Sequence, residues 1–196
     1  NIKCRKSGLA PSCVVIVATI RALKMHGGVE KEDLKKENVD ALKKGLINLE
    51  RHISNIKKFG LEPIVAINHF ILDTNLEINT VLNFCKDRKV EVSECKHWAK
   101  GGKGAVDLAK KVVKICKKKK NKFDFLYKDN LKLWDKIELI AKQIYKADKI
   151  TANSDVINEL DKFEKNGHRN LPVCIAKTQY SFSTDPKLKG APSNHE

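Results

Sequence analysis

The fold is decided by "CVVIVATI", residues 13–20, a run of apolar and β-branched residues without a charge. Such a run, preceded by Pro11, is typical of a strand buried on both faces of a parallel sheet. A second apolar run, "PIVAI" at 63–67, and the segment "KVEVSE" at 89–94 predict two further strands. The sequence therefore predicts at least three strands in the first half of the chain.

Apolar residues recur at helical spacing between these strands. From Val39 onward they fall three or four positions apart, which predicts one amphipathic helix that Gly60 ends. Thr74 and Glu77 have the spacing of a capping box for a helix reaching about Arg88. Similar stripes predict helices over 106–115, 134–144 and 154–165, the last capped by Ser154 and stopped by Gly167. Strands alternating with helices indicate an α/β fold with a mostly parallel sheet.

The second half is less regular. "LPVCIA" at 171–176 predicts a last strand, and Ile150 is the expected start of a short one. Residues 177–196 contain Pro, Gly and Ser without periodicity, so we expect a loop.

Charge and cysteine usage narrow the class of protein. The 196 residues contain 39 Lys and Arg against 24 Asp and Glu, a formal net charge of +15 that attracts polyanions. No zinc-finger spacing, aromatic RNA-binding signature or basic zipper is present, so nucleic acid is a disfavoured partner. No apolar run approaches the length of a membrane span, and we expect no membrane association. Six widely spaced cysteines without a CxxC pair indicate a reduced, cytoplasmic protein.

Ligands of open α/β sheets bind beyond the carboxyl ends of the strands. Four segments follow predicted strands and hold much of the unusual chemistry: 21–28, 68–73, 98–104 and 177–185. We expect these segments to converge on a cleft that takes a flat heterocycle and an anion.

The glycine-rich stretch "WAKGGKGA", residues 98–105, lies in one of these segments. It is neither a Walker A loop nor a GxGxxG motif, because Gly101, Gly102 and Gly104 stand too close together and Ala105 follows. Its backbone N–H groups could bind an anion at a helix N-terminus, or the glycines could simply form a tight strand-to-helix turn. Trp98 is open to two interpretations, stacking on a ligand ring or burial in the core.

Two histidines are also ambiguous. His26, beside Gly27 and Gly28, could orient a substrate or serve the structure alone. Cys95 and His97 lack the two further ligands that zinc requires, so no metal site is predicted.

The block "VATIRALKMHGG", residues 17–28, resembles a signature of the formate–tetrahydrofolate ligases. The resemblance continues in order along the chain, through 48–70, 97–109, 136–145 and 171–192. It implies synthesis of 10-formyltetrahydrofolate from formate, ATP with Mg, and tetrahydrofolate by way of formyl phosphate. It also implies a homotetramer with no tightly bound cofactor.

The same resemblance implies site residues. Trp98 and Phe70 would line the folate and nucleotide cleft, with Asn68, Gly101 and Gly102 beside them. Arg21 and His26 are candidates for positioning substrate, and no catalytic residue is assigned. Ile71 stands where relatives often have Pro, which alters the expected pocket wall.

The family's phosphate loop lies upstream of the matching region, so the chain is expected to be an incomplete part of a larger P-loop-type ligase. Its expected divisions are 1–36, the end of a nucleotide-binding domain, 37–122, an α/β lobe, and 123–196, a second α/β lobe with a C-terminal loop. Its expected partners are the N-terminal portion of the enzyme and further copies. We expect the chain to be inactive alone. The alternatives are a non-catalytic remnant that binds nucleotide, folate or a partner, and a basic nucleic-acid binder.

Overall fold

The structure of the protein, a computed structural model, describes residues 2–118, 122–176, 182, 183, 185, 187, 188, 190–193 and 195. The chain forms two compact units, which are described separately. Pro11–Phe123 make up the sheet unit, and Asn1–Ala10 with Asp124–Glu196 make up the helical unit. The expected three-part division of the chain stays a prediction about the larger enzyme.

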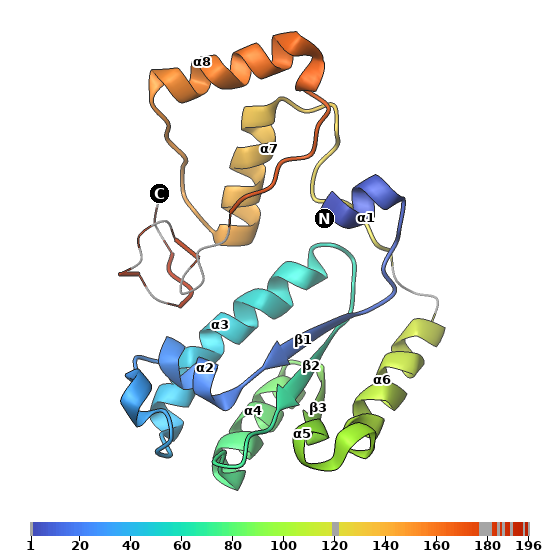
Figure 1. The fold of residues 1–196 in the computed structure, drawn as a ribbon, viewed down its shortest axis with the longest axis vertical. Coiled ribbons are helices and arrows are strands. Elements are labelled where there is room, and N and C mark those ends of the chain that lie inside the picture. The colour runs from blue at the N-terminus through green and yellow to red at the C-terminus, as the bar shows by residue number, and fades with distance from the viewer. Residues whose placement is uncertain are drawn as a thin grey trace. The chain divides into compact units, whose positions relative to one another are not determined.

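Three parallel strands form the sheet, in the order β1 (Val14–Ala18), β2 (Pro63–Asn68), β3 (Glu91–Cys95) (Figure 1). The predicted α/β fold with a parallel sheet is confirmed. The register pairs Ala18 with Ile67 and Asn68 with Cys95, so the three strands end nearly level. The segments that follow the strands therefore leave from the same edge.

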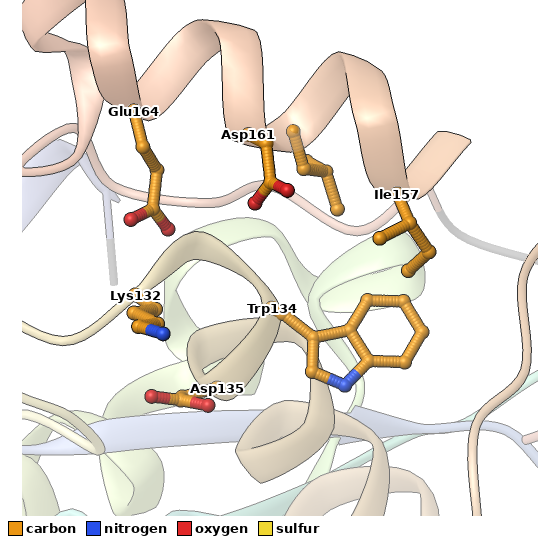
Figure 2. A pocket seen from close by; sticks show the side chains of 7 residues that line it. Lys132, Trp134, Asp135, Ile157, Asp161 and Glu164 are labelled. Carbon is orange, nitrogen blue, oxygen red and sulfur yellow. The ribbon is translucent and has the colours of Figure 1, made fainter. Parts of the chain in front are cut away.

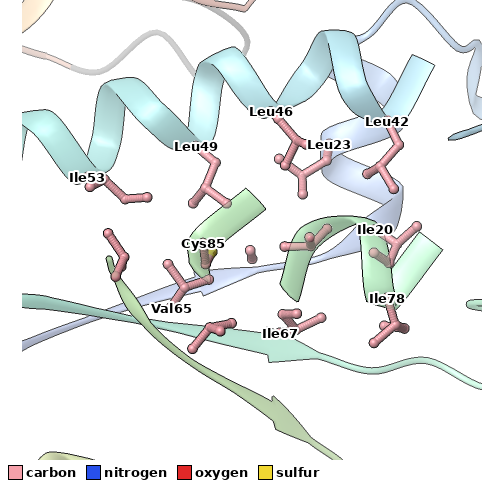
Figure 3. Packing of buried hydrophobic residues seen from close by; sticks show 14 residues of the cluster. Ile20, Leu23, Leu42, Leu46, Leu49, Ile53, Val65, Ile67, Ile78 and Cys85 are labelled. Carbon is pink, nitrogen blue, oxygen red and sulfur yellow. The ribbon is translucent and has the colours of Figure 1, made fainter. Parts of the chain in front are cut away.

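Helices cover the two faces of this sheet. One face carries α2 (Ile20–His26), α3 (Val39–Lys57) and α4 (Asn75–Asp87), whose apolar residues share one core with the strands. The predicted stripe of α3 is buried, and Figure 3 shows Leu42, Leu46, Leu49 and Ile53 pointing toward α2 and β2. Burying each such side chain contributes about 1.5–3 kcal/mol. The other face carries α6 (Val106–Lys117), which packs on β3 and β2.

The expectation that β1 is buried on both faces was wrong. Its side chains alternate, and among the described residues Val15 and Val17 stay exposed, Val17 by 66 %. Because α6 packs on β3 and β2, no described helix of the sheet unit packs closely on that face of β1. Apolar composition alone could not reveal which face a neighbouring element covers. β2, in the middle of the sheet, is buried along nearly its whole length.

A buried ion pair joins three helices of the sheet unit. Glu77, in the first turn of α4, is fully buried and accepts from Lys24 Nζ at 2.8 Å and from the backbone N–H of Asn38 at 3.1 Å. It also completes the predicted capping box with Thr74, which is confirmed. Burial raises the pKa of the Glu77 carboxyl, but the bonds from Lys24 and the two backbone groups outweigh it and lower the pKa.

The helical unit contains α1 (Ile2–Ser7), α7 (Leu133–Ile140) and α8 (Ser154–Phe163). π-Helical turns extend α7 over Ala141–Tyr145 and α8 over Glu164–His168. The cap of α8 is Asn153, whose side chain accepts from Val156 N–H, so the prediction of Ser154 was off by one residue. Gly167, at φ 85°, lies at the predicted stop.

The strands predicted at 171–176 and from Ile150 are absent, because residues 150–153 and 171–176 adopt neither strand nor helix. Side chains hold the segment instead. The buried Lys136 donates from Nζ to the carbonyls of Arg169 at 2.6 Å and Leu171 at 3.0 Å, and the Tyr127 hydroxyl accepts from Val173 N–H. Burial lowers the pKa of Lys136. Within the described ranges, no helix is long and apolar enough to cross a membrane.

Candidate functional site

The three strand ends meet at a pocket of about 340 Å³ in the sheet unit. Each strand contributes the residues that follow it: Arg21 after β1, His69, Phe70 and Ile71 after β2, and Lys96, Trp98 and Ala99 after β3. The predicted convergence is therefore confirmed for these three segments. Of the fourth, residues 177–181 and 184 lie outside the described residues.

Arg21 and Phe70 form one wall of the pocket. The Arg21 guanidinium carbon lies 4.7 Å from the centre of the Phe70 ring, a cation–π contact that covers one face of the ring. Phe70 itself is fixed, since its N–H donates to Asp73 Oδ2 at 2.8 Å. Burial raises the pKa of the Asp73 carboxyl. Arg21 Nε is buried and has no hydrogen-bond partner among the described residues, which is unusual for a charged donor.

Glu94, near the end of β3, contacts two residues that line the pocket, His69 and Lys96. Its Oε1 accepts from His69 Nδ1 at 2.5 Å and from Lys96 Nζ at 3.1 Å. The backbone N–H of His69 also donates to Cys95 O at 3.1 Å, so His69 is held at both ends. Burial raises the pKa of Glu94, but the bonds from His69 and Lys96 outweigh it and the pKa is lowered. The bonds from His69 and Lys96 thus favour the carboxylate form of Glu94.

Trp98 lies on the four-residue helix α5 (His97–Lys100) and is 80 % exposed. Of its two interpretations, burial in the core does not hold within the sheet unit. Its indole borders the pocket and is free to cover a ligand ring there.

The glycine-rich stretch forms a tight turn between two helices. After α5, residues Gly101–Ala105 form a 3₁₀ turn that leads into α6. A Cβ on Gly104 would lie 2.4 Å from the Lys96 carbonyl, and Lys96 N–H donates to Gly104 O at 3.0 Å. Gly104 is thus needed for close packing of the turn. Gly101, at φ 55°, and Gly102 are exposed and do not line the pocket.

Two other predicted site residues also lie outside the pocket lining. Asn68 is the last residue of β2 and is half-buried. His26 is the last residue of α2, and the neighbouring Gly27 lets α2 approach α3, since a Cβ there would lie 1.8 Å from Ala41 O. The binding roles of Asn68, Gly101, Gly102 and His26 stay predictions.

Glu94 and Lys96 were missed as site residues. In "VEVSECK" they stand two positions apart, the period that places strand side chains on one face, at the carboxyl end of a strand. That pattern was the available signal. Charged residues at a strand end are usually solvated, so this spacing alone did not indicate a site.

The helical unit has a second pocket, of about 300 Å³, between α7 and α8 (Figure 2). Figure 2 shows Trp134 and Ile157 on the right and Asp135 and Glu164 on the left, with Asp161 above. Glu164 caps the start of α7, because its Oε1 accepts from Leu133 N–H at 2.7 Å. Across the described ranges, no group of three or more His, Cys, Asp or Glu could hold a metal ion.

Comparison with known proteins gives a consistent result. The family model described as formate–tetrahydrofolate ligase matches residues 1–196. The whole chain is 59 % identical, over 195 residues, to the formate–tetrahydrofolate ligase of Pelagibacter ubique. Its identity is 54 % to the ligase of Rhizobium rhizogenes and 52 % to that of Ruegeria pomeroyi. The chain spans 35 % of the length of each of these relatives.

Proposed function

The chain belongs to the formate–tetrahydrofolate ligase family, and from that premise we propose that it supplies the ring-binding pocket of such a ligase. The proposed reaction joins formate to tetrahydrofolate with cleavage of ATP and gives 10-formyltetrahydrofolate. ATP with Mg and tetrahydrofolate are substrates in this proposal, and no tightly bound cofactor is involved.

The observation that carries the proposal is the pocket at the carboxyl edge of the sheet. It combines two aromatic rings, Phe70 and Trp98, with the buried and unpartnered Nε of Arg21. A pteridine or purine is flat and carries acceptor atoms at its edge, so it suits stacking with a charged donor alongside. Because Arg21 already covers one face of Phe70, the exposed Trp98 offers the more accessible ring for stacking.

In the proposed reaction, formate oxygen attacks the γ-phosphorus of ATP, releasing ADP and forming formyl phosphate. The N10 amine of tetrahydrofolate then attacks the formyl carbon, the bond from that carbon to the phosphate oxygen breaks, and the amine proton leaves with phosphate. The contribution of this chain is to hold the ring so that N10 is in place, which accelerates the second step by orientation.

We propose that residues 1–196 alone bind a ligand but do not turn over ATP. No stretch of the sequence has the GxxxxGK[ST] spacing, and the turn at 101–105 serves close packing instead. The residues that bind the ATP phosphates would come from other parts of the ligase. A cytoplasmic homotetramer is part of the same proposal.

The test uses a chimera in which residues 1–196 replace the matching region of the Pelagibacter ubique ligase. We expect ADP release that depends on both formate and tetrahydrofolate from the chimera and none from the 196-residue chain. An inactive chimera that still binds tetrahydrofolate would favour a non-catalytic remnant. Binding to nucleic acid that collapses with rising salt would favour a basic nucleic-acid binder.

Trp98→Ala in the chimera should raise the Kd for tetrahydrofolate about threefold to tenfold by calorimetry, because one stacking surface is lost. Trp98→Phe keeps an aromatic ring and should retain most of the affinity. Trp134→Phe, in the helical unit, is the matched control. An unchanged Kd in Trp98→Ala would remove Trp98 from the site.

A further inference from the structure

The sheet unit carries an apolar surface over β1 on the face opposite its core. Val15 and Val17 alternate with core residues of β1, so they point to this opposite face, where they are 38 % and 66 % exposed. β1 is also an edge strand of the three-stranded sheet. Parallel sheets are normally covered by helices on both faces. On this face α6 packs on β3 and β2, so the position of a neighbouring helix over β1 is open within the described part of the sheet unit.

Helix α6 turns an apolar flank toward this open position. The flank consists of four exposed residues spaced three, four and three positions apart: Val106, Ala109, Val113 and Cys116. The opposite flank of α6 is occupied by contacts with β3. There Asp107 accepts from Ser93 Oγ at 2.6 Å, and Lys111 Nζ donates to Val92 O at 2.6 Å. Because β1 and β3 lie on opposite sides of β2, the apolar flank faces β1.

Two thiols support this direction of the flank. Cys13 directly precedes β1, and Cys116 lies in the last turn of α6. Burial raises the pKa of the Cys13 thiol, and the charges of Cys116 and Glu62 raise it further. Such an effect requires the groups to be near each other, so the end of α6 stands close to the start of β1. We call the surface between the two elements the β1–α6 groove, formed by Val15, Val17, Val106, Ala109, Val113 and Cys116.

The charge beside the groove and the length of the relatives indicate its occupant. Lys110 and Lys117 follow Val106 and Val113 by one helical turn, are exposed, and pair with no carboxylate among the described residues. A second copy of this chain is a poor occupant, because each copy carries a formal net charge of +15. The chain spans only 35 % of the length of its relatives, so most of such a ligase lies outside the matched region.

We propose that the β1–α6 groove docks an amphipathic helix from the part of the ligase outside residues 1–196. This helix lies on β1 beside α6, its apolar stripe covers Val17 and Val113, and acidic residues along its edge meet Lys110 and Lys117. The docked helix completes the second face of the sheet. The inference goes beyond the proposed function, because it concerns how the rest of the ligase holds this unit and not what the pocket binds.

Cys116 is a native reporter of the groove, and the test measures its alkylation rate by mass spectrometry. The rate in the 196-residue chain is compared with the rate in the chimera with the Pelagibacter ubique ligase. We expect alkylation at least about tenfold slower in the chimera, because a thiol under a docked helix reacts only when the helix opens. Lys114→Cys supplies the control thiol, since Lys114 is exposed on the flank of α6 near β3 and lies 4.0 Å from Glu91. The control thiol should react at the same rate in both proteins.

Val17→Lys tests the floor of the groove. In the 196-residue chain Val17 is exposed, so the substitution should leave the alkylation rate of Cys116 unchanged. In the chimera it places an ammonium under the docked helix, and burial of an unpaired charge opposes docking. The rate should then rise to within about threefold of the rate in the 196-residue chain. Val156→Lys, an exposed valine of α8, is the matched control and should leave Cys116 protected.

Equal alkylation rates of Cys116 in the chain and in the chimera overturn the inference. Protection that develops in the 196-residue chain as its concentration rises makes a second copy the occupant and also overturns it. If Val17→Lys prevents the chimera from folding, the two unsubstituted proteins decide. The readout needs no ligand, so a chimera that protects Cys116 but binds no tetrahydrofolate contradicts the proposed function and leaves this inference standing.

Discussion

Removing the cation of the buried Lys24–Glu77 pair should destabilise the sheet unit strongly. In Lys24→Met the carboxylate of Glu77 stays fully buried and keeps only the N–H groups of Asn38 and Thr74, at 3.1 and 3.2 Å. Stranding one partner of a buried ion pair costs about 3–5 kcal/mol. The change also leaves the Lys36 carbonyl without the donor that Lys24 Nζ provides at 2.7 Å.

The assay is urea unfolding followed by far-ultraviolet circular dichroism. With a dependence on urea of roughly 2 kcal/mol per molar, the midpoint should fall by about 2 M. Glu50→Gln breaks the exposed pair with Arg88 and should cost less than about 1 kcal/mol. A loss in Lys24→Met no larger than in this control would refute the reasoning.

The loss of stability in Lys24→Met should also depend on pH. The folded-state pKa of Glu77 is lowered from 4.5, so its contribution to stability is present above that value and is lost as the pH falls through the folded-state pKa. In Lys24→Met the uncompensated carboxylate can take up a proton, which relieves the buried charge. The difference in unfolding free energy between parent and variant should therefore shrink on acidification. A difference that stays constant from pH 7 to pH 4 would contradict this account.

Two further predictions concern packing and thiol reactivity. Gly104→Ala should destabilise the sheet unit by about 1–3 kcal/mol in the same urea assay, because the added Cβ would meet the Lys96 carbonyl. Gly102→Ala is the control: a Cβ there lies in open space, so stability should change by less than about 0.5 kcal/mol. Cys85 is fully buried, and burial raises its pKa to about 11. Brief alkylation of the folded protein, read by mass spectrometry, should therefore label the exposed Cys116 and Cys174 but not Cys85. Cys85 should become labelled only when urea unfolds the chain.

Sequence reasoning succeeded where apolar residues were both periodic and numerous. The stripe of α3 and the run of β2 are buried against each other in one core, as their apolar patterns predict. It failed for 171–176, which has similar apolar content. Pro172 removes one backbone donor there, and no described strand of the helical unit pairs with the segment. Lys136 and Tyr127 bind its backbone instead, and partners 35 and 46 positions away in sequence cannot be inferred from a local pattern.

The site was predictable in its position and only partly in its members. Because parallel strands end together, Arg21, Phe70 and Trp98 could be brought to one edge from sequence alone. The link through Glu94 depends on register, since β3 must pair with β2 so that Glu94 lies opposite Ile67, two residues before His69. A shift by one residue would place Glu94 on the other face.

Most of the block 17–28 serves to cap and pack one short helix, α2. Thr19 caps α2 by accepting from Ala22 N–H, Lys24 reaches the buried Glu77, and Gly27 allows the backbone of α2 to approach α3. Arg21 alone among these directs a charge to the pocket, where it lies over Phe70. These contacts hold the helix at its start, middle and end, and the same helix carries Arg21. Under the proposed function, any change that loosens the Lys24 or Gly27 contact should therefore weaken tetrahydrofolate binding through Arg21 before the unit unfolds.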